Sequence, residues 1–225
     1  MTRNERFSGL KSRWIRTRLV RRVWADMLPS FTVFDVETTG LDPKRGHRIT
    51  ELGAVRIENG QVQREKTFCT FVNPERDIPA EVKQITHISD EDVAGAPTIM
   101  AVLPQFLEFA QGTYLVAHNA NFDMSFLETE KEFCWGYLEL PEAFCTMKLS
   151  QHIWPTAFRH TLDQVGTRLN LEIPKDRHRA LPDVLLTADA LVAMLPQAKV
   201  STIEQLRRVA GLALAAAKAP VAARR

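Results

Sequence analysis

The sequence has few cysteines, and their spacing does not fit a metal or disulfide framework. Its 225 residues contain three, Cys69, Cys134 and Cys145, an odd number without a C-x-x-C pair. This argues against a disulfide-stabilised secreted domain and a structural zinc site, and favours reduced thiols in a cytoplasmic protein. No internal repeat occurs, and no apolar run reaches the ~18 residues of a membrane helix. We therefore expect no membrane span.

The length allows one domain with a sizeable core and leaves some excess at both ends. We expect a basic, helical N-terminal extension over residues 1–28, a folded domain over 29–200, and a C-terminal helix and tail over 201–225. Residues 1–28 carry eight basic and two acidic side chains, a balance of +6, so the rest of the chain sums to −4 against a total of +2.

The N-terminal extension has an apolar side and a basic side when it is read as a helix from Ile15 onward. Such a helix could dock on protein, contact nucleic-acid phosphates or lie on an anionic membrane. We rank docking onto protein first, because Trp14 and Trp24 would be poorly placed in water. The segment lacks the compact apolar region of a secretory signal, although its arginine-rich composition leaves organelle import open.

Turn and periodicity signals predict a mixed α/β fold. Asn59-Gly60 separates two strand-like runs, Ile49–Ile57 and Val62–Val72, which together with the run from Phe31 predict three antiparallel strands. Later strands, beginning with 113–117, are expected to be parallel and the sheet to be flanked by helices. The predicted helices are Glu81–Ile85, Thr98–Ala110, Asp123–Phe133, Met147–Ile153, Leu162–Leu169 and Asp183–Leu195. A capping box at Ser201–Glu204 predicts a last helix from Gln205 to about Lys218.

Two acids lie in the first predicted strand. Asp35 and Glu37 are two residues apart, so their side chains point to the same face. Neighbouring carboxylates in a buried strand repel each other, which a raised pKa or a bound cation relieves. A lone Asp-x-Glu is more often the solvated end of a strand, so this segment does not decide between the two readings by itself.

Two later segments supply further ionisable residues. Asp123 lies in the first turn of a predicted helix after the strand 113–117, where it could bind a ligand or complement the helix dipole. Asp183 lies at the start of another helix, and His178 precedes it by five residues on a charged loop. A loop histidine with a near-neutral pKa suits a general base, although it could equally be a solvated side chain. Four carboxylates and a histidine, brought together, could hold two divalent ions and activate water for phosphodiester hydrolysis.

The three segments together resemble a known family. Asp-x-Glu, then His-Asn-Ala-x-Phe-Asp, then His followed five residues later by Asp resembles the DEDD exonucleases of the histidine subtype, typified by the proofreading epsilon subunit of bacterial DNA polymerase III. The resemblance runs from about Phe31 to about Leu195. It implies a ribonuclease-H-like sheet, two Mg²⁺ or Mn²⁺ ions, and removal of nucleoside monophosphates from a 3′ end.

The resemblance also implies roles for individual residues. It makes Asp35, Glu37, Asp123 and Asp183 the metal ligands and His178 the general base, and it places the terminal nucleotide on Thr38, Leu41 and Phe122. The sequence departs from the family at His87, which occupies a position that usually carries glycine. The other acids, among them Asp42, Asp163 and Asp189, are expected to lie outside the site.

We expect a two-metal 3′-to-5′ exonuclease acting on single-stranded or frayed 3′ ends of DNA, in proofreading or repair. Its N-terminal helix could bind a DNA polymerase or another protein. Asp35, Asp123 and Asp183 would hold one ion, and Asp35 chiefly the second, with Glu37 orienting the attacking side. A 3′ exoribonuclease with the same residues is the nearest alternative, because contacts to the 2′-hydroxyl are not disclosed by these motifs. A non-catalytic scaffold that binds a polymerase or nucleic acid is a weaker one, since all five residues are present.

Overall fold

The computed structural model of the chain describes residues 28–134 and 138–212, and in them a five-stranded mixed sheet. The strand order is β3-β2-β1-β4-β5. β1 pairs antiparallel with β2, and β2 with β3, whereas β4 runs parallel to both β1 and β5. The bounds are β1 Phe31–Thr38, β2 Ile49–Glu58, β3 Gln61–Phe71, β4 Tyr114–Ala117 and β5 Ala143–Cys145. The predicted mixed α/β sheet is confirmed; β5, only three residues long, was not predicted.

A tight turn and a bulge shape the antiparallel edge of the sheet. Asn59 and Gly60 join β2 to β3 with φ angles of 52° and 66°, the left-handed conformation that the predicted two-residue hairpin requires. Val55 pairs with Thr67 but Arg56 pairs with Gln63, so residues 64–66 bulge out of the ladder. These three residues are Arg, Glu and Lys, and all are exposed on the edge strand β3.

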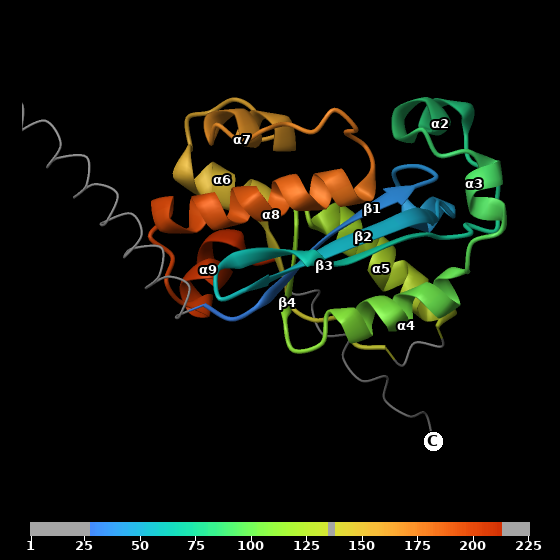
Figure 1. Ribbon diagram of the computed structural model, residues 1–225, viewed down its shortest axis with the longest axis horizontal. Helices are drawn as coiled ribbons and strands as arrows, with labels where there is room; N and C mark the ends of the chain where they lie inside the picture. The colour runs from blue at the N-terminus through green and yellow to red at the C-terminus, as the bar shows by residue number, and fades with distance from the viewer. Residues whose placement is uncertain (1–27, 135–137, 213–225) are drawn as a thin grey trace, which may run out of the picture.

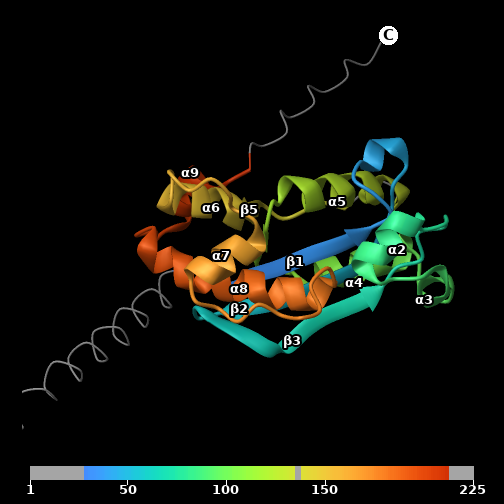
Figure 2. The same cartoon turned by 90° about the horizontal axis from the view of Figure 1, so that it is seen from above.

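Helices cover both faces of the sheet, as Figure 1 shows, with α8 along one face and α4 on the other. The view from above places α7 and α8 in front of the strands (Figure 2). The bounds are η1 Pro43–Arg45, α2 Ala80–Thr86, α3 Asp90–Ala94, α4 Ile99–Phe109, α5 Asn121–Phe133, α6 Thr146–Ile153, α7 Leu162–Arg168, α8 Ala180–Gln197 and α9 Ile203–Ala210.

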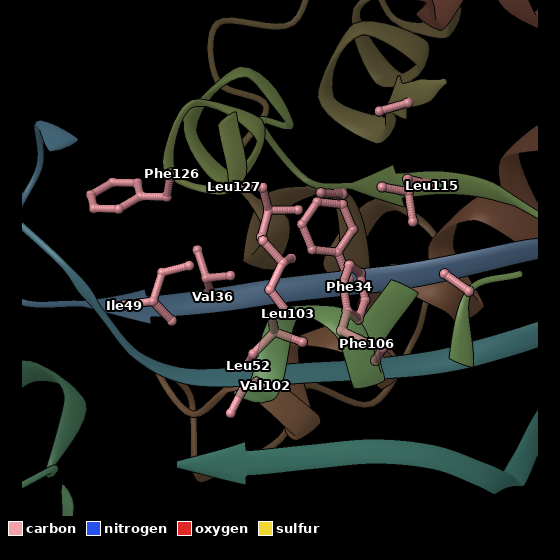
Figure 3. Close-up of a cluster of buried hydrophobic side chains, with 14 of the residues drawn as sticks. Phe34, Val36, Ile49, Leu52, Val102, Leu103, Phe106, Leu115, Phe126 and Leu127 are labelled. Atoms are coloured by element: carbon pink, nitrogen blue, oxygen red, sulfur yellow. The ribbon is translucent and has the colours of Figure 1, made fainter. Parts of the chain in front are cut away.

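Alternation along the central strand β1 divides the core into two halves. Phe34 and Val36 point to α4 and α5 and join a buried cluster with Leu103, Phe106 and Phe126 (Figure 3). Residues 31 and 33 point the other way, into a cluster with α8, α7, α6 and α9. Because side chains alternate along a strand, residues 35 and 37 lie on the same face as residues 31 and 33 and point to the α8 layer.

The structure corrects three boundaries of the last two helices, α8 and α9. α8 begins at Ala180, three residues before the predicted start, because a buried glutamate of β2, Glu51, accepts a hydrogen bond from the Ala180 amide. α9 begins after Thr202, which caps it together with Gln205, one residue beyond the predicted capping box. It ends at Ala210 and not near residue 218, because Gly211 leaves the helix and bridges to Phe144.

The N-terminal extension lies outside the described residues except for Leu28, so its helix stays a prediction. Among the described residues, α8 alone has the length and apolar composition of a membrane span, with a mean hydropathy of 1.2. Its apolar side chains pack against β1 and β2 in the core of the domain. We therefore read α8 as a core helix.

Gly53 lets the start of α8 approach the sheet. It lies in β2 directly opposite Asp35 of β1. A Cβ atom built on Gly53 would stand 2.9 Å from both the carbonyl carbon and the Cβ of Ala180. A side chain here would therefore push the first turn of α8 away from β1.

We expect Gly53→Ala to lower the free energy of unfolding by about 1–3 kcal/mol, the usual cost of overpacking a core. Gly95→Ala is the matched control, because nothing lies within 4 Å of the Cβ position there and the backbone φ of −95° is open to alanine. Urea unfolding of both variants measures the difference. Equal midpoints for Gly53→Ala and wild type would contradict the close approach of α8.

Candidate active site

Three carboxylates from two distant segments meet at one end of the sheet. Asp35, Glu37 and Asp183 each offer an oxygen atom, and these three atoms lie within 4.8 Å of one another. β1 supplies the first two on the face that it turns to α8, and the first turn of α8 supplies the third. The alternation expected for an Asp-x-Glu strand thus produces the cluster.

Asp123 stands beside this group. It is 2% exposed in the first turn of α5, and its Oδ1 accepts a hydrogen bond of 3.3 Å from the Val36 amide of β1. Its charge raises the pKa of both Asp35 and Glu37, so the four acids share one electrostatic environment. The trio that lies closest together, however, is Asp35, Glu37 and Asp183, whereas the sequence led us to group Asp35, Asp123 and Asp183.

Burial raises the pKa values of Asp35, Glu37 and Asp123, and repulsion by neighbouring acids adds to this for Asp35 and Glu37. Burial is the largest cause for Asp35, whose pKa is raised well above the usual range, followed by the charges of Asp123 and Glu37. Burial and the charge of Glu51 raise the pKa of Glu37 from 4.5 to about 8. Burial raises the pKa of Asp123 to about 7, against two backbone hydrogen bonds that favour its charged form. Near neutral pH the site therefore favours bound protons or cations.

One arginine provides positive charge at the site. The guanidinium of Arg177 contacts Asp183 and lies 2.6 Å from Asp163 of α7. Its charge lowers the pKa of Asp35 and Glu37, but less than burial raises them. No ion pair among the described residues includes Asp35, Glu37 or Asp123, so these carboxylates keep their oxygens for another cation.

A second arginine fixes the start of α8 to the sheet. Glu51, 3% exposed and directly opposite Glu37 in the sheet, accepts hydrogen bonds of 3.0 and 2.8 Å from Arg179. It also accepts one of 3.0 Å from the Ala180 amide. A carboxylate at this position satisfies a helix N–H group and complements the helix dipole. This contact holds the first turn of α8, and with it Asp183, against β2.

His178 lies immediately before this anchored arginine. It is exposed on the loop between α7 and α8, with a left-handed φ of 65°. Its ring makes no hydrogen bond to the described residues and is not part of the close carboxylate group. The assignment of His178 as general base stays a prediction.

The three residues predicted to contact the nucleotide differ in how exposed their side chains are. Leu41, 83% exposed on the loop after β1, can pack against a base or sugar. Phe122 is half-buried and packs on Phe126 with ring centroids 5.1 Å apart. The Thr38 hydroxyl is buried and donates a hydrogen bond of 2.6 Å to the Gly40 carbonyl. Thr38 therefore shapes the loop, and its hydroxyl is already engaged.

The backbone conformation at position 87 accounts for the departure from the family pattern. It ends α2 with a φ of 56°, and its amide donates to the Lys83 carbonyl. Glycine adopts this left-handed conformation at no steric cost, which accounts for the usual residue at this place.

The remaining acids have other partners. Asp42 caps η1, Asp163 contacts Arg177, and Asp189 binds Arg64 at 2.6 Å. None of them belongs to the close carboxylate group.

The donor set fits hard divalent ions. Carboxylate oxygens are the ligands that Mg²⁺, Mn²⁺ and Ca²⁺ prefer, and the group contains no cysteine or histidine that would favour softer metals. Sequence reasoning missed three residues that arrange this donor set, Glu51, Arg179 and Gly53. The available signal was a glutamate inside an otherwise apolar strand.

Comparison with known proteins agrees with this geometry. The exonuclease family model matches residues 32–191. The DNA polymerase III subunit epsilon of Rickettsia prowazekii is 37% identical over 167 residues, covering 72% of each chain. A DNA polymerase III subunit epsilon-like protein of Rhodobacter capsulatus is 42% identical over 171 residues, which cover 76% of this chain and 24% of that protein.

Among solved structures, exonuclease X in complex with 5′ overhanging duplex DNA superimposes with a TM-score of 0.65 at 28% identity, covering 80% of this chain and 98% of that one. The chain spans about a quarter of the Rhodobacter relative and most of the Rickettsia one. Its fold, its carboxylate group and these matches agree. The chain belongs to the exonuclease family and is similar to the epsilon subunit of DNA polymerase III.

Proposed function

We propose that the chain removes nucleoside 5′-monophosphates from the 3′ end of DNA with two divalent ions, Mg²⁺ or Mn²⁺. The observation that carries this proposal is the group of Asp35, Glu37 and Asp183 within 4.8 Å, with Asp123 beside it. Asp35, Glu37 and Asp183 would hold the first ion, and Asp35 and Asp123 would face the second. Bound there, the ions would activate water and neutralise charge on the scissile phosphate.

The protein's own residues position the reacting groups. The Glu51 contact holds the first turn of α8 against β2 and so keeps Asp183 beside the carboxylates of β1. His178, on its exposed loop, would accept the proton of the attacking water. Leu41 would pack against the terminal nucleotide, since its side chain projects into solvent after β1.

The relatives support DNA as the substrate. The exonuclease X structure contains duplex DNA with a 5′ overhang, and the Rickettsia relative is a DNA polymerase subunit. We extend both to this chain as proposals: a DNA 3′ end as the substrate, and a DNA polymerase as a partner in the cytoplasm.

The first prediction concerns protons and metal. Glu37 holds its proton more tightly in the folded chain, where its pKa is about 8, than in the unfolded chain, where it is near 4.5. The stability from this proton is complete below about pH 4.5 and is lost as pH rises through about 8. We expect the melting temperature of the metal-free protein to fall from about pH 5 to pH 8, and Mn²⁺ to restore it most at the upper end.

Differential scanning fluorimetry across pH, with chelator or with Mn²⁺, measures this effect. Glu37→Gln is the matched variant, because it keeps the shape of the side chain and cannot ionise; it should flatten the fall. A metal-free protein whose stability rises over this pH range would refute the electrostatic description of the site.

The second prediction concerns the substrate. Single-stranded DNA labelled at its 5′ end should shorten progressively and release 5′-monophosphates with Mg²⁺ or Mn²⁺, and chelator should stop the reaction. A 3′-phosphate should block it. Faster digestion of a matched RNA would replace DNA by RNA as the substrate, and early internal fragments would indicate an endonuclease.

The third prediction distinguishes a metal ligand, Asp35, from the proposed general base, His178. Asp35→Ala should lose Mn²⁺ binding and activity together, because this carboxylate belongs to the close group and would face both ions. His178→Ala should keep Mn²⁺ binding and lose about 10²- to 10⁴-fold in single-turnover rate, together with the rising limb of the pH profile.

Two control variants fix the scale for these losses. Asp189→Ala removes an acid that lies on α8, as Asp183 does, but is paired with Arg64. His152→Ala removes an exposed histidine of α6. Both should cleave at the wild-type rate. If His178→Ala behaves like His152→Ala, the general base is another group.

A further inference from the structure

The loop between α6 and α7 presents an aromatic ring and a cation at its tip. Phe158 is 93% exposed, the most exposed of the large apolar side chains described. The guanidinium carbon of Arg159, also exposed, lies 5.9 Å from the centre of its ring. Arg168 is half-buried; it donates a hydrogen bond of 2.6 Å to the Arg159 carbonyl and lies 5.8 Å from the half-buried ring of Trp154.

Buried hydrogen bonds fix the conformation of this loop. His118, which follows β4, donates through Nε2 to the His160 carbonyl at 2.9 Å and accepts from the Thr146 hydroxyl at Nδ1. His160 accepts from Ser150 at 2.7 Å and donates to the Ala157 carbonyl. Burial lowers the pKa of His118 to about 4, so its ring stays neutral in these contacts. The exposed tip therefore stands on a rigid base.

The same contacts join the loop to the two segments that carry site residues. His118 lies five residues before Asp123 in the chain and bonds directly to the loop. On the other side, Asp163 begins α7 and binds Arg177, which contacts Asp183. The loop is thus joined to the carboxylate group through both β4 and α8.

The charge of the loop differs from that of its surroundings. Residues 213–225 carry three basic side chains, so residues 29–212 sum to −7. Among the ion pairs of the described residues, none includes Arg159 or Arg168. An acidic body repels a polyanion, so a cationic and aromatic surface beside the site is where a nucleic-acid strand is attracted.

We propose that Phe158 and Arg159 form a binding site for single-stranded DNA upstream of the 3′ end, with the phenyl ring stacked on a base and the guanidinium on a phosphate. This inference rests on the proposed function. Stacking on an aromatic side chain tolerates every base, so the site would bind DNA without sequence preference. It would hold a long substrate while the carboxylates remove its last nucleotide.

Equilibrium binding of a fluorescent 20-nucleotide single strand to the full chain tests the proposal, with Ca²⁺ in place of Mg²⁺ and the strand checked for cleavage. Phe158→Ala should weaken binding about tenfold, the scale of one lost stacking contact. Phe158→Trp should retain it. Arg159→Gln should lower the salt dependence by about 0.7 in log–log slope, the value for one phosphate contact on a single strand.

Two measurements separate strand binding from a structural effect. Met100→Ala on α4 and Arg208→Gln on α9 remove an exposed apolar and an exposed basic side chain elsewhere, and should bind as wild type does. Hydrolysis of the p-nitrophenyl ester of thymidine 5′-monophosphate, too short to reach the loop, should be unchanged in Phe158→Ala.

Three outcomes would overturn the proposal. The first is wild-type affinity of Phe158→Ala for the single strand. The second is an equal loss on the nitrophenyl ester, which would make the loop part of the site's structure. The third is a loss confined to duplex DNA, which would assign the loop to the complementary strand. Wild-type protein that neither binds nor cleaves DNA would instead refute the proposed function itself.

Discussion

Repulsion among buried carboxylates is the constraint on which the rest of this structure depends. Burial raises the pKa of Asp35, Glu37 and Asp123, and neighbouring negative charge raises that of Asp35 and Glu37 further, so the fold must hold together groups that would separate in water. β1 can hold them because it is the central strand, with apolar side chains packed on both faces. The stability of the core thus sustains an electrostatic strain that a divalent cation would relieve.

The close group also depends on contacts between segments far apart in the chain. α8 brings Asp183 to β1 only because Gly53 leaves room for its first turn and Glu51 binds its amide end. Arg179 completes this anchor and fixes the chain one residue after His178. The site is therefore assembled by β2, a strand that contributes no member of the close carboxylate group. Substitutions in β2 can alter metal binding without touching a ligand.

Much of the fold and of the donor set could be predicted from local patterns. The hairpin at Asn59-Gly60, the alternation of Asp35 and Glu37 and most helices follow from short-range signals. The start of α8 could not be predicted, because its cap comes from Glu51 and periodicity does not show a partner in another element. Which carboxylates lie closest together could not be predicted either, because it depends on how α5 and α8 pack on β1. Phe158 could not be identified as a functional residue from the sequence, because a single exposed phenylalanine produces no periodic pattern.

The bulge at residues 64–66 affects whether another chain can add a strand to the sheet at β3. β3 is a long edge strand whose outer hydrogen-bonding groups could serve as a template for another chain. Three consecutive charged residues interrupt its ladder there, and an incoming strand would have to bury their charges or skip them. The β3 edge is therefore a poor template for the addition of another strand.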